Sequence, residues 1–256
     1  MNTPWVRKYQ PKKAIEVVGQ DAAMRDLTKF VLDHAHQKKK AALIYGPSGV
    51  GKTSAVHAIA QEQGIEILEI NASDTRNKDS IDLILGNALK QRSLFSTGKI
   101  VLVDEIDGIT GMEDRGGVGA IAALIEKSAF PVVMTAQNPF DSKFTPVRSK
   151  SNVIQFQSLE ATDVFTILKQ ISIHEKVHIG DEELKTIARR AGGDARAAVN
   201  DLQSLASDGK TITQESVDTL SERDQTQTMA SAMLRILKTT DPNVALSAFD
   251  NVEEDI

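Results

Sequence analysis

The chain contains no cysteine, few aromatic residues and no long apolar run. Among its 256 residues there is no Cys, and Phe, Trp and Tyr together make up 4%. The lack of cysteine excludes disulfides, thiolate zinc sites and cysteine nucleophiles, and it favours a reducing, cytoplasmic compartment. No apolar segment approaches the length of a transmembrane helix, and no signal-peptide pattern is present, so we expect no membrane association.

The remaining composition is that of an ordinary globular protein. Hydrophobic residues account for 41% of the chain and charged residues for 25%, which is enough to bury the core of one or two domains. The net charge of −5 argues against indiscriminate binding to nucleic acid, although it leaves room for a local basic face.

Residues 46–53, Gly-Pro-Ser-Gly-Val-Gly-Lys-Thr, fit the phosphate-binding pattern G-x-x-x-x-G-K-[ST]. The apolar run at 41–45 predicts a buried strand before the loop, and 54–61 predicts a helix after it. Glycines allow backbone N–H groups to approach phosphate oxygens, and a helix N-terminus favours negative charge. Lys52 can reach the β- and γ-phosphates, and the Thr53 hydroxyl can ligate Mg²⁺. The alternative is a chance match in a glycine-containing turn.

A second acidic motif follows an aliphatic run at 99–103, which predicts another buried strand. Asp104 and Glu105 end this run, at the edge of an open parallel sheet where ligands bind. Asp104 would hold Mg²⁺ through water, and Glu105 would orient and deprotonate an attacking water. The alternative is a strand that runs into an acidic turn.

Alternating strands and helices continue to about residue 157 and predict an α/β fold. Further strands are expected at 65–70, 131–138 and 153–156, and helices at 21–37, 79–92 and 120–128. Residues 108–119 are rich in glycine and predict a loop. Asn138 ends the fourth strand, where it could bond phosphate and water or simply form a turn before Pro139.

After residue 158 the pattern predicts helices only, at 160–174, 181–191, 194–206 and 215–220. We therefore expect a nucleotide-binding domain at 1–157, with a five-stranded parallel sheet flanked by helices, and a small all-α lid at 158–224. Residues 225–256 would begin a third helical domain, a collar that the chain does not complete.

Two further segments leave alternatives open. Residues 1–20 hold two prolines and the only Trp, which predicts an extended arm; it either anchors to the domain or walls an adenine pocket. His174 and His178 match H-E-x-x-H, but zinc binding would need both on one continuous helix. Because the helical pattern ends near His174, we interpret both as surface histidines.

These motifs resemble those of the AAA+ ATPases and, more narrowly, of archaeal-type large subunits in the clamp-loader family, replication factor C. The resemblance rests on residues 4–11 with 18–20, on 71–74, on 104–108 with 113–117, and on 193–200. It extends over nearly the whole chain.

The resemblance implies an ATPase site, weakly active in the isolated chain. Lys52, Glu105, Asn138 and Arg196 would be catalytic, with Asn138 and Arg196 as the two sensors of the γ-phosphate. Thr53 and Asp104 would hold Mg²⁺. The other residues implied to bind ATP or ADP are Val6, Tyr9, Val18, Gly19, Gly46, Pro47, Ser48, Gly49, Val50, Gly51 and Ser54.

The implied partners are clamp-loader small subunits, a ring-shaped sliding clamp of the PCNA type and primer-template DNA. Arg76 and Lys78 would contact the DNA backbone, or they are simply solvated charges. Small subunits carry Ser-Arg-Cys, whose arginine acts on the neighbour's ATP, whereas this chain has Ser-Lys-Ser at 149–151. Lysine lacks the planar fork of arginine, so the chain is expected to receive an arginine finger and not donate one, with Arg148 as a possible shifted finger.

Two other functions remain as alternatives. A hexameric helicase or branch-migration motor would need an arginine finger in every subunit, which Lys150 disfavours. A nucleotide-dependent scaffold would not need the Asp104-Glu105 pair, because the glutamate serves only hydrolysis.

Overall fold

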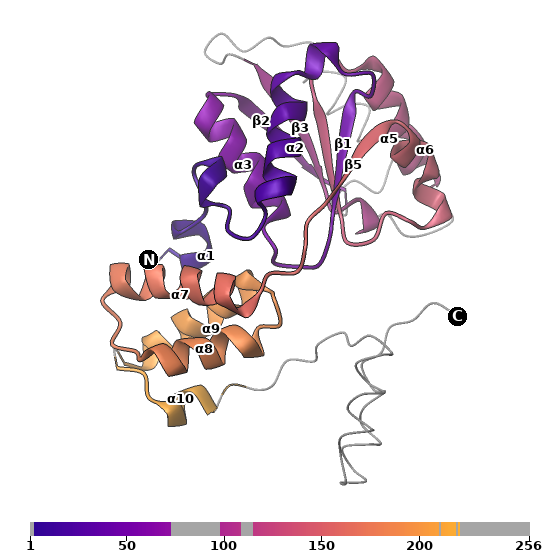
Figure 1. The fold of residues 1–256 in the computed structure, drawn as a ribbon. Coiled ribbons are helices and arrows are strands. Elements are labelled where there is room, and N and C mark those ends of the chain that lie inside the picture. The colour runs from indigo at the N-terminus through magenta and orange to yellow at the C-terminus, as the bar shows by residue number, and fades with distance from the viewer. Residues whose placement is uncertain (1–2, 73–97, 109–114, 210, 219, 221–256) are drawn as a thin grey trace, which may run out of the picture.

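The computed structural model describes residues 3–72, 98–108, 115–209, 211–218 and 220. Five strands form one parallel sheet in the order β2-β3-β4-β1-β5 (Figure 1). The strands are β1 (Ala41–Tyr45), β2 (Glu66–Asn71), β3 (Lys99–Asp104), β4 (Val132–Ala136) and β5 (Ser151–Gln155). The α/β fold with a five-stranded parallel sheet, predicted from the sequence, is confirmed.

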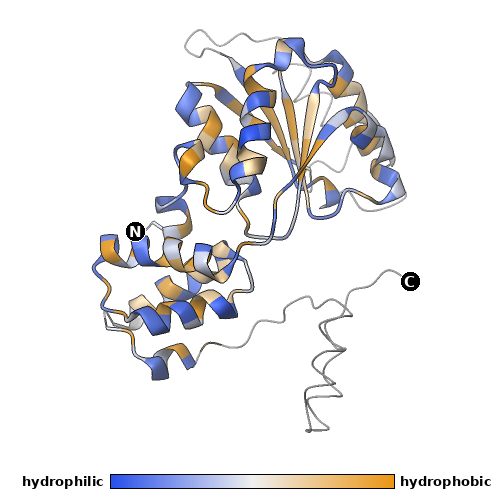
Figure 2. Cartoon of the chain, in the orientation of Figure 1, coloured by the Kyte–Doolittle hydropathy of each residue, from blue (hydrophilic) through white to orange (hydrophobic). Residues whose placement is uncertain are grey.

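The central strands are aliphatic because helices cover both faces of the sheet. Ala42 and Ile44 of β1 belong to one apolar cluster, while Ala41 and Leu43 belong to the other, as the period of two requires. Figure 2 shows these strands as a hydrophobic layer. The first face is covered by α2 (Asp21–Leu32) and α3 (Lys52–Gln63), and the second by α5 (Arg115–Lys127) and α6 (Thr145–Ser149).

The helices after β5 form a separate group beside the strand ends (Figure 1). They are α7 (Ala161–Glu175), α8 (Asp181–Arg190), α9 (Ala195–Asp208) and α10 (Gln214–Asp218). Buried Leu168, Ile187 and Leu202 lie in the same apolar cluster as the α2 and α3 side chains. We call α7–α10 the lid helices; their packing is continuous with that of the sheet domain.

The N-terminal arm was predicted to be extended, and this prediction is wrong. Trp5–Lys8 form a short helix, α1, and Ala14–Glu16 form a 3₁₀ turn, η1. Pro4 is the residue at the helix N-cap, where its missing N–H has no cost, so it precedes the helix without breaking it. The Trp5 backbone N–H donates to Gln203 of α9 at 2.7 Å, which ties the arm to the lid helices.

The glycine-rich loop predicted at 108–119 is wrong in its second half. Helix α5 begins at Arg115 and includes Gly116, Gly117 and Gly119. Buried Val118 and Ile121 pack on the sheet, and this burial outweighs the weak helix propensity of glycine.

Three other short turns connect the elements, η2 (His34–His36), η3 (Ile106–Gly108) and η4 (Ser142–Phe144). The helix predicted at 21–37 ends at Leu32, and η2 follows it. The predicted helix at 79–92 and the collar at 225–256 lie outside the described residues. Within the described ranges, no helix is both long enough and apolar enough to cross a membrane.

Candidate active site

The glycine loop joins β1 to α3 and wraps around the N-terminus of that helix. Gly46 has a φ of +148° and a Cβ there would lie 2.1 Å from the Phe156 carbonyl oxygen. Gly49 has a φ of +67° and a Cβ there would lie 1.8 Å from Asp194 Oδ1. Both positions therefore exclude larger side chains, and the loop can keep its N–H groups close to a bound anion.

Lys52 is the first residue of α3 and bends back over the loop. Its Nζ donates to the carbonyl oxygens of Gly46 and Pro47, both at 2.7 Å. Burial lowers the pKa of Lys52 from its ordinary value, while the charges of Asp107 and Asp104 oppose that change. An ammonium group held this way can transfer its hydrogen bonds to phosphate oxygens when an anion enters the loop.

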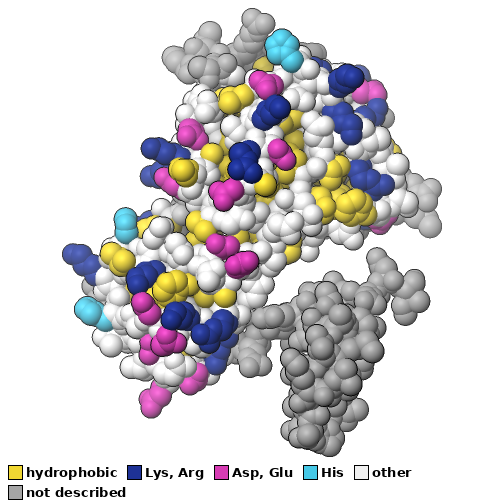
Figure 3. Space-filling model, viewed as in Figure 1, with side chains coloured by type: hydrophobic (Ala, Val, Ile, Leu, Met, Phe, Trp, Pro, Cys, Tyr) yellow, Lys and Arg dark blue, Asp and Glu magenta, His cyan; other side chains and the backbone are white. Residues whose placement is uncertain are grey.

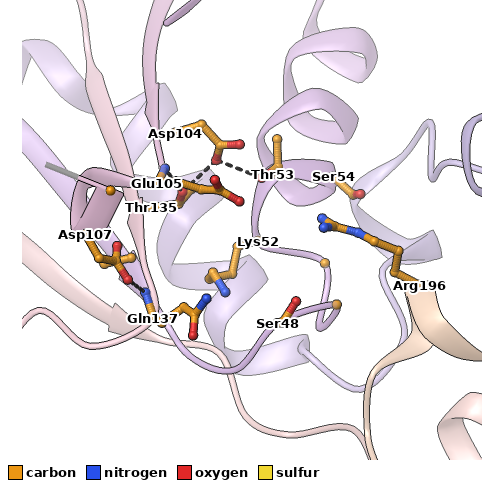
Figure 4. Close-up of a pocket in the computed structure, with 14 residues that line it drawn as sticks. Ser48, Lys52, Thr53, Ser54, Asp104, Glu105, Asp107, Thr135, Gln137 and Arg196 are labelled. Carbon is orange, nitrogen blue, oxygen red and sulfur yellow. Dashed lines mark hydrogen bonds between the residues drawn. The ribbon is translucent and has the colours of Figure 1, made fainter. Parts of the chain in front are cut away.

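Asp104 lies at the end of β3, two strands from β1 in the sheet order. Its Oδ1 accepts hydrogen bonds from Thr53 Oγ1 at 2.8 Å and from Thr135 Oγ1 at 2.6 Å (Figure 4). Thr135 is buried in β4 and also accepts the Glu105 N–H at 2.9 Å. The Thr135 hydroxyl therefore positions both acidic residues.

Glu105 has a left-handed backbone, with a φ of 55°. A non-glycine residue in this region is uncommon, and such strain of about 1–3 kcal/mol concentrates at functional sites. The side chain is exposed and lines the cavity beside the glycine loop. The backbone hydrogen bond to Thr135 holds the strained conformation in place.

These groups surround a cavity of about 390 Å³, within the usual size range of small-molecule sites. Arg196 of α9 reaches it from the side opposite Gln137 (Figure 4). The side chains or backbones at its wall are Ser48, Gly49, Gly51, Lys52, Thr53, Ser54, Asp104, Glu105, Asp107, Gly108, Thr135, Ala136, Gln137 and Arg196.

A second cavity of about 590 Å³ adjoins the first and lies between the arm and the lid helices. Apolar side chains from three segments line it, including Val17, Ile171 and Val199. The two cavities share Gly49, Gly51, Thr53, Ser54, Asp104 and Arg196. Together they form a polar, charged chamber that opens into a more apolar one.

The predicted nucleotide-binding residues outside the first cavity fall into two groups, those that line the second cavity and those that line neither cavity. Val6, Tyr9 and Val18 line the second cavity, as does Val50 of the glycine loop. Gly19 is not among its lining residues; it has a φ of +74° and lies against Leu159 and Asp163. Gly46 and Pro47 contribute the carbonyl oxygens that hold Lys52 and do not line either cavity.

Asn138 is not among the residues that line the cavity. Its Oδ1 accepts the Phe140 N–H at 3.0 Å, so it caps the turn that follows β4. The neighbouring Gln137 lines the cavity instead, and its backbone N–H donates to Asp107 Oδ2. The structure thus places Gln137 where the sequence predicted Asn138.

Lys150 and Arg148 are both engaged within the chain. Lys150 forms an ion pair with Glu126 of α5. Arg148 donates to the Pro139 carbonyl oxygen at 2.7 Å and lies over the Phe140 ring at 5.6 Å. Neither side chain lines either cavity of this chain.

The H-E-x-x-H segment does not form one helix. Helix α7 ends at Glu175, Lys176 has a left-handed φ of 56°, and His178 pairs as a bridge with Thr211. The two histidines therefore do not share a helical face, which is what the zinc interpretation would need. Arg76 and Lys78 lie outside the described residues.

The oxygen atoms of Thr53 and Asp104 fit a magnesium ion. Mg²⁺ prefers hard oxygen ligands and is usually held by one or two carboxylates together with substrate phosphates. Across the described ranges, no group of three or more His, Cys, Asp or Glu side chains could hold a metal. The donor set thus suits an ion that arrives with a phosphate ligand better than a metal held by protein alone.

Known proteins share both the sequence and the fold. Residues 42–159 match the model of the ATPase family associated with various cellular activities, AAA. The replication factor C large subunit of Nanoarchaeum equitans is 43% identical over 251 residues, which are 98% of this chain and 58% of that protein. That of Staphylothermus marinus is 49% identical over 205 residues, 79% of this chain and 48% of that protein. Residues 42–159 therefore form an AAA ATPase domain.

Over most of its length the chain is similar to archaeal replication factor C large subunits, as the sequence motifs indicated. It spans about half to three-fifths of the length of these relatives. A mutant of RuvB from Thermotoga maritima shares the fold, with a TM-score of 0.65 and 19% identity over 96% of this chain and 86% of that one. At that identity, the likeness concerns the fold alone.

The sequence analysis assigned no role to three residues of this site, Thr135, Asp107 and Gln137. Thr135 could have been suspected, because a hydroxyl inside an aliphatic strand needs a partner. Asp107 is the third acidic residue in the run 104–107. Gln137 stands beside Asn138, and only the direction of the chain after β4 distinguishes them.

Proposed function

We propose that this chain is the ATP-hydrolysing part of a clamp-loader large subunit. In the assembled complex it would couple ATP binding and hydrolysis to the opening of a sliding clamp and its loading on primed DNA. The observation that carries the proposal is the joined cavity, charged at the glycine loop and more apolar between arm and lid helices. A triphosphate fits the first chamber and a nucleobase the second.

The residues of the first chamber divide the work of hydrolysis. The loop N–H groups and Lys52 would bind the phosphates, and Thr53 and Asp104 would hold the metal. Mg²⁺ would neutralise charge that develops on the phosphate oxygens. Glu105 would orient the attacking water and accept its proton, since it lines the cavity and, unlike Asp104, makes no hydrogen bond to Thr53.

Two side chains are positioned to sense the terminal phosphate. Gln137 takes the role that the sequence assigned to Asn138, because its side chain lines the cavity. Arg196 reaches in from α9, the helix whose N-cap residue, Asp194, contacts the glycine loop at Gly49. A contact between Arg196 and phosphate would therefore bind the lid helices to the nucleotide.

The engaged Lys150 supports a role as receiver of an arginine finger. A lysine paired with Glu126 lacks both the free charge and the planar fork needed to act on a neighbour's ATP. Arg148 is likewise held by Pro139 and Phe140. The same contacts disfavour the motor alternative, in which every subunit donates a finger.

The partners follow from this role. They are small subunits that complete the ATP site, a PCNA-like ring and primer-template DNA contacted through its backbone by Arg76 and Lys78. Figure 3 shows Lys and Arg mixed with Asp and Glu on the face in view, which suits local DNA contacts better than a broad basic surface.

We further propose a domain division at 1–157 and 158–224, with a collar beginning at 225.

A single-turnover ATPase assay tests the proposal. The chain would be assembled with small subunits whose own phosphate loops are inactivated, then mixed with ATP, clamp and primer-template DNA. We expect hydrolysis that the clamp and DNA accelerate together, and its loss in Lys52→Ala. Equal hydrolysis with and without clamp and DNA would contradict a clamp loader, and activity that survives Lys52→Ala would place the site elsewhere.

A further inference from the structure

Asp107 is a third carboxylate at the cavity, and none of the roles above uses it. It lies on η3, immediately after the strand that carries Asp104, and it lines the same chamber. Its Oδ2 accepts the backbone N–H of Gln137 at 2.5 Å. Figure 4 shows Asp107 and Gln137 side by side, with Lys52 next to them.

This hydrogen bond continues the connection between two strands beyond the end of their ladder. The pairing of β3 with β4 runs only from Val101 opposite Val132 to Val103 opposite Met134. Past that point, Thr135 holds the Glu105 N–H, and Asp107 holds the Gln137 N–H. A hydrogen bond from a backbone N–H to a carboxylate is of the stronger, charge-assisted type, so it fixes the direction of the chain where β4 ends.

The other oxygen of Asp107 has an unusual environment. Oδ1 is buried and has no hydrogen-bond partner. A buried polar atom without a partner costs about 1–3 kcal/mol, and such atoms concentrate where a functional role maintains them. A residue that served only to fill this space would not need a carboxylate.

We propose that Asp107 is a positioning residue for ATP hydrolysis and acts through Gln137. It holds the Gln137 backbone so that the side-chain amide faces the terminal phosphate and the attacking water. The inference rests on the proposed ATPase function. It assigns Asp107 no contact with the nucleotide, so the residue should affect the rate of hydrolysis and leave ATP affinity nearly unchanged.

Two substitutions of Asp107 separate geometry from charge. Asp107→Asn keeps an oxygen that can accept the Gln137 N–H but removes the charge. Asp107→Glu keeps the charge but moves the carboxylate by one methylene. If the hydrogen bond is what matters, Asp107→Glu slows single-turnover hydrolysis by about 10- to 100-fold, the cost of a misplaced group. The Asp107→Asn variant then hydrolyses ATP at a rate within about threefold of wild type, because it keeps the acceptor. ATP affinity, measured with a fluorescent analogue, changes less than about threefold in either.

A double-mutant cycle with Gln137→Ala tests the route of the effect. If Asp107 acts through Gln137, adding Asp107→Glu to Gln137→Ala causes no further loss, because the side chain to be positioned is already absent. Asp141→Asn is the matched control: Asp141 also accepts a backbone N–H, that of Lys143 at 2.9 Å, but lies outside the cavity. It should leave hydrolysis unchanged.

Three results would overturn the inference. They are a wild-type rate in Asp107→Glu, a loss in Asp107→Asn as large as in Asp107→Glu, and a full additional loss in the double variant. Each of these results counts against the inference only if the wild-type complex hydrolyses ATP and Lys52→Ala abolishes that hydrolysis. If the wild-type complex itself shows no such hydrolysis, the proposed function fails, so the two failures are distinguishable.

Discussion

At the scale of single residues, the site depends on one buried hydroxyl. Thr135 Oγ1 donates to Asp104 and accepts the N–H of Glu105, so it sets the positions of the proposed metal ligand and the proposed catalytic base together. Glu105 needs this support because its backbone lies in a strained region. The carboxylates of the motif are therefore insufficient by themselves.

Thr135→Val tests this dependence, since valine has nearly the same shape but no hydroxyl. We expect a 10- to 100-fold loss in apparent Mg²⁺ affinity or hydrolysis, the usual order for the loss of an outer partner of a metal ligand. Unfolding free energy should fall by about 1–3 kcal/mol because the Glu105 N–H loses its acceptor. A Mg²⁺ titration of ATPase activity and urea unfolding measure the two effects. Thr135→Ser keeps the hydroxyl and should behave as wild type; an equal defect in Thr135→Ser would show that the hydroxyl alone does not set these positions.

The contiguous motifs of the site could be read from the sequence residue by residue, but the residues that hold them in position, such as Thr135 and Asp107, could not. Lys52, Thr53, Asp104 and Glu105 fall within two short patterns whose chemistry is local to the chain. Gln137 and Asn138 are adjacent polar residues at a strand end, so a shift of one residue exchanges the side chain that faces the cavity. Sequence alone does not resolve such a choice because it depends on the Asp107 and Phe140 contacts.

At the scale of elements, strands were the most predictable feature. The sheet is covered on both faces, so its central strands are uninterrupted aliphatic runs, and β1 was predicted at its observed bounds. The arm and the start of α5 were missed because packing decided them. In both segments the prolines or glycines favour a non-helical backbone, whereas tertiary contacts stabilise a helix.

The contact between the glycine loop and α9 joins two elements that a nucleotide would touch. Gly49 accepts the Ala195 N–H through its carbonyl oxygen at 3.2 Å and lies against Asp194. Gly49→Ala should therefore displace the lid helices and strain the loop, lowering ATP affinity at least about tenfold and unfolding free energy by about 1–3 kcal/mol. Nucleotide titration and urea unfolding measure these effects.

Gly119→Ala provides the matched control for that substitution. Gly119 lies in α5 with open space around its added Cβ. Alanine there should stabilise the helix by about 0.5–1 kcal/mol and leave nucleotide binding as it is. Unchanged ATP affinity in Gly49→Ala would mean that the loop and α9 do not act together.

The arm is attached to the lid helices by Glu175 of α7. Glu175 accepts from Lys8 Nζ at 2.8 Å and from the Tyr9 hydroxyl at 2.9 Å. The hydrogen bond from Lys8 lowers the pKa of Glu175 from its ordinary value of 4.5. A lowered folded-state pKa adds stability above the unfolded value, and this contribution disappears as pH falls through the folded-state pKa.

Glu175→Gln should therefore loosen the arm at neutral pH and have no effect in acid. We expect faster trypsin cleavage after Arg7 or Lys12 in the variant at pH 7. Thermal unfolding followed from pH 7 downward should show the difference from wild type shrinking as the pH falls through the lowered folded-state pKa of Glu175, and disappearing only below it, where the wild-type carboxylate is protonated. Glu182→Gln is the control, because Glu182 pairs with Lys185 on its own helix and holds no arm. A difference that persisted in acid would refute the ionic attachment.

At the scale of the whole molecule, Lys150 is the residue on which the proposed position of the chain in an assembly rests. Lys150 is paired with Glu126 and lacks the planar guanidinium group of an arginine finger. Lys150→Ala should therefore leave the ATPase rate of the assembled complex within about twofold of wild type, whereas removal of an arginine finger lowers the rate by about 10³-fold or more. Steady-state hydrolysis with clamp and primed DNA measures it. Arg148→Ala separates the shifted-finger alternative: a large loss there alone would make this chain a donor after all.

The joined cavity predicts how nucleotide should affect the stability of the whole chain. Its walls come from the sheet domain, the arm and the lid helices together, so a bound nucleotide contacts all three, whereas the unfolded chain offers no such site. ATP at about 100 times its dissociation constant then adds about 2.7 kcal/mol, which corresponds to a rise in Tm of about 5–10 °C for a domain of this size. Mg²⁺ should increase the shift because Thr53 and Asp104 would hold the ion beside the phosphates. Differential scanning fluorimetry with ATP, with and without Mg²⁺, measures it, and Lys52→Ala should remove most of the rise. A shift of the same size in Lys52→Ala would mean that the ligand binds elsewhere, since no other ammonium is aimed at the loop among the residues lining the first cavity.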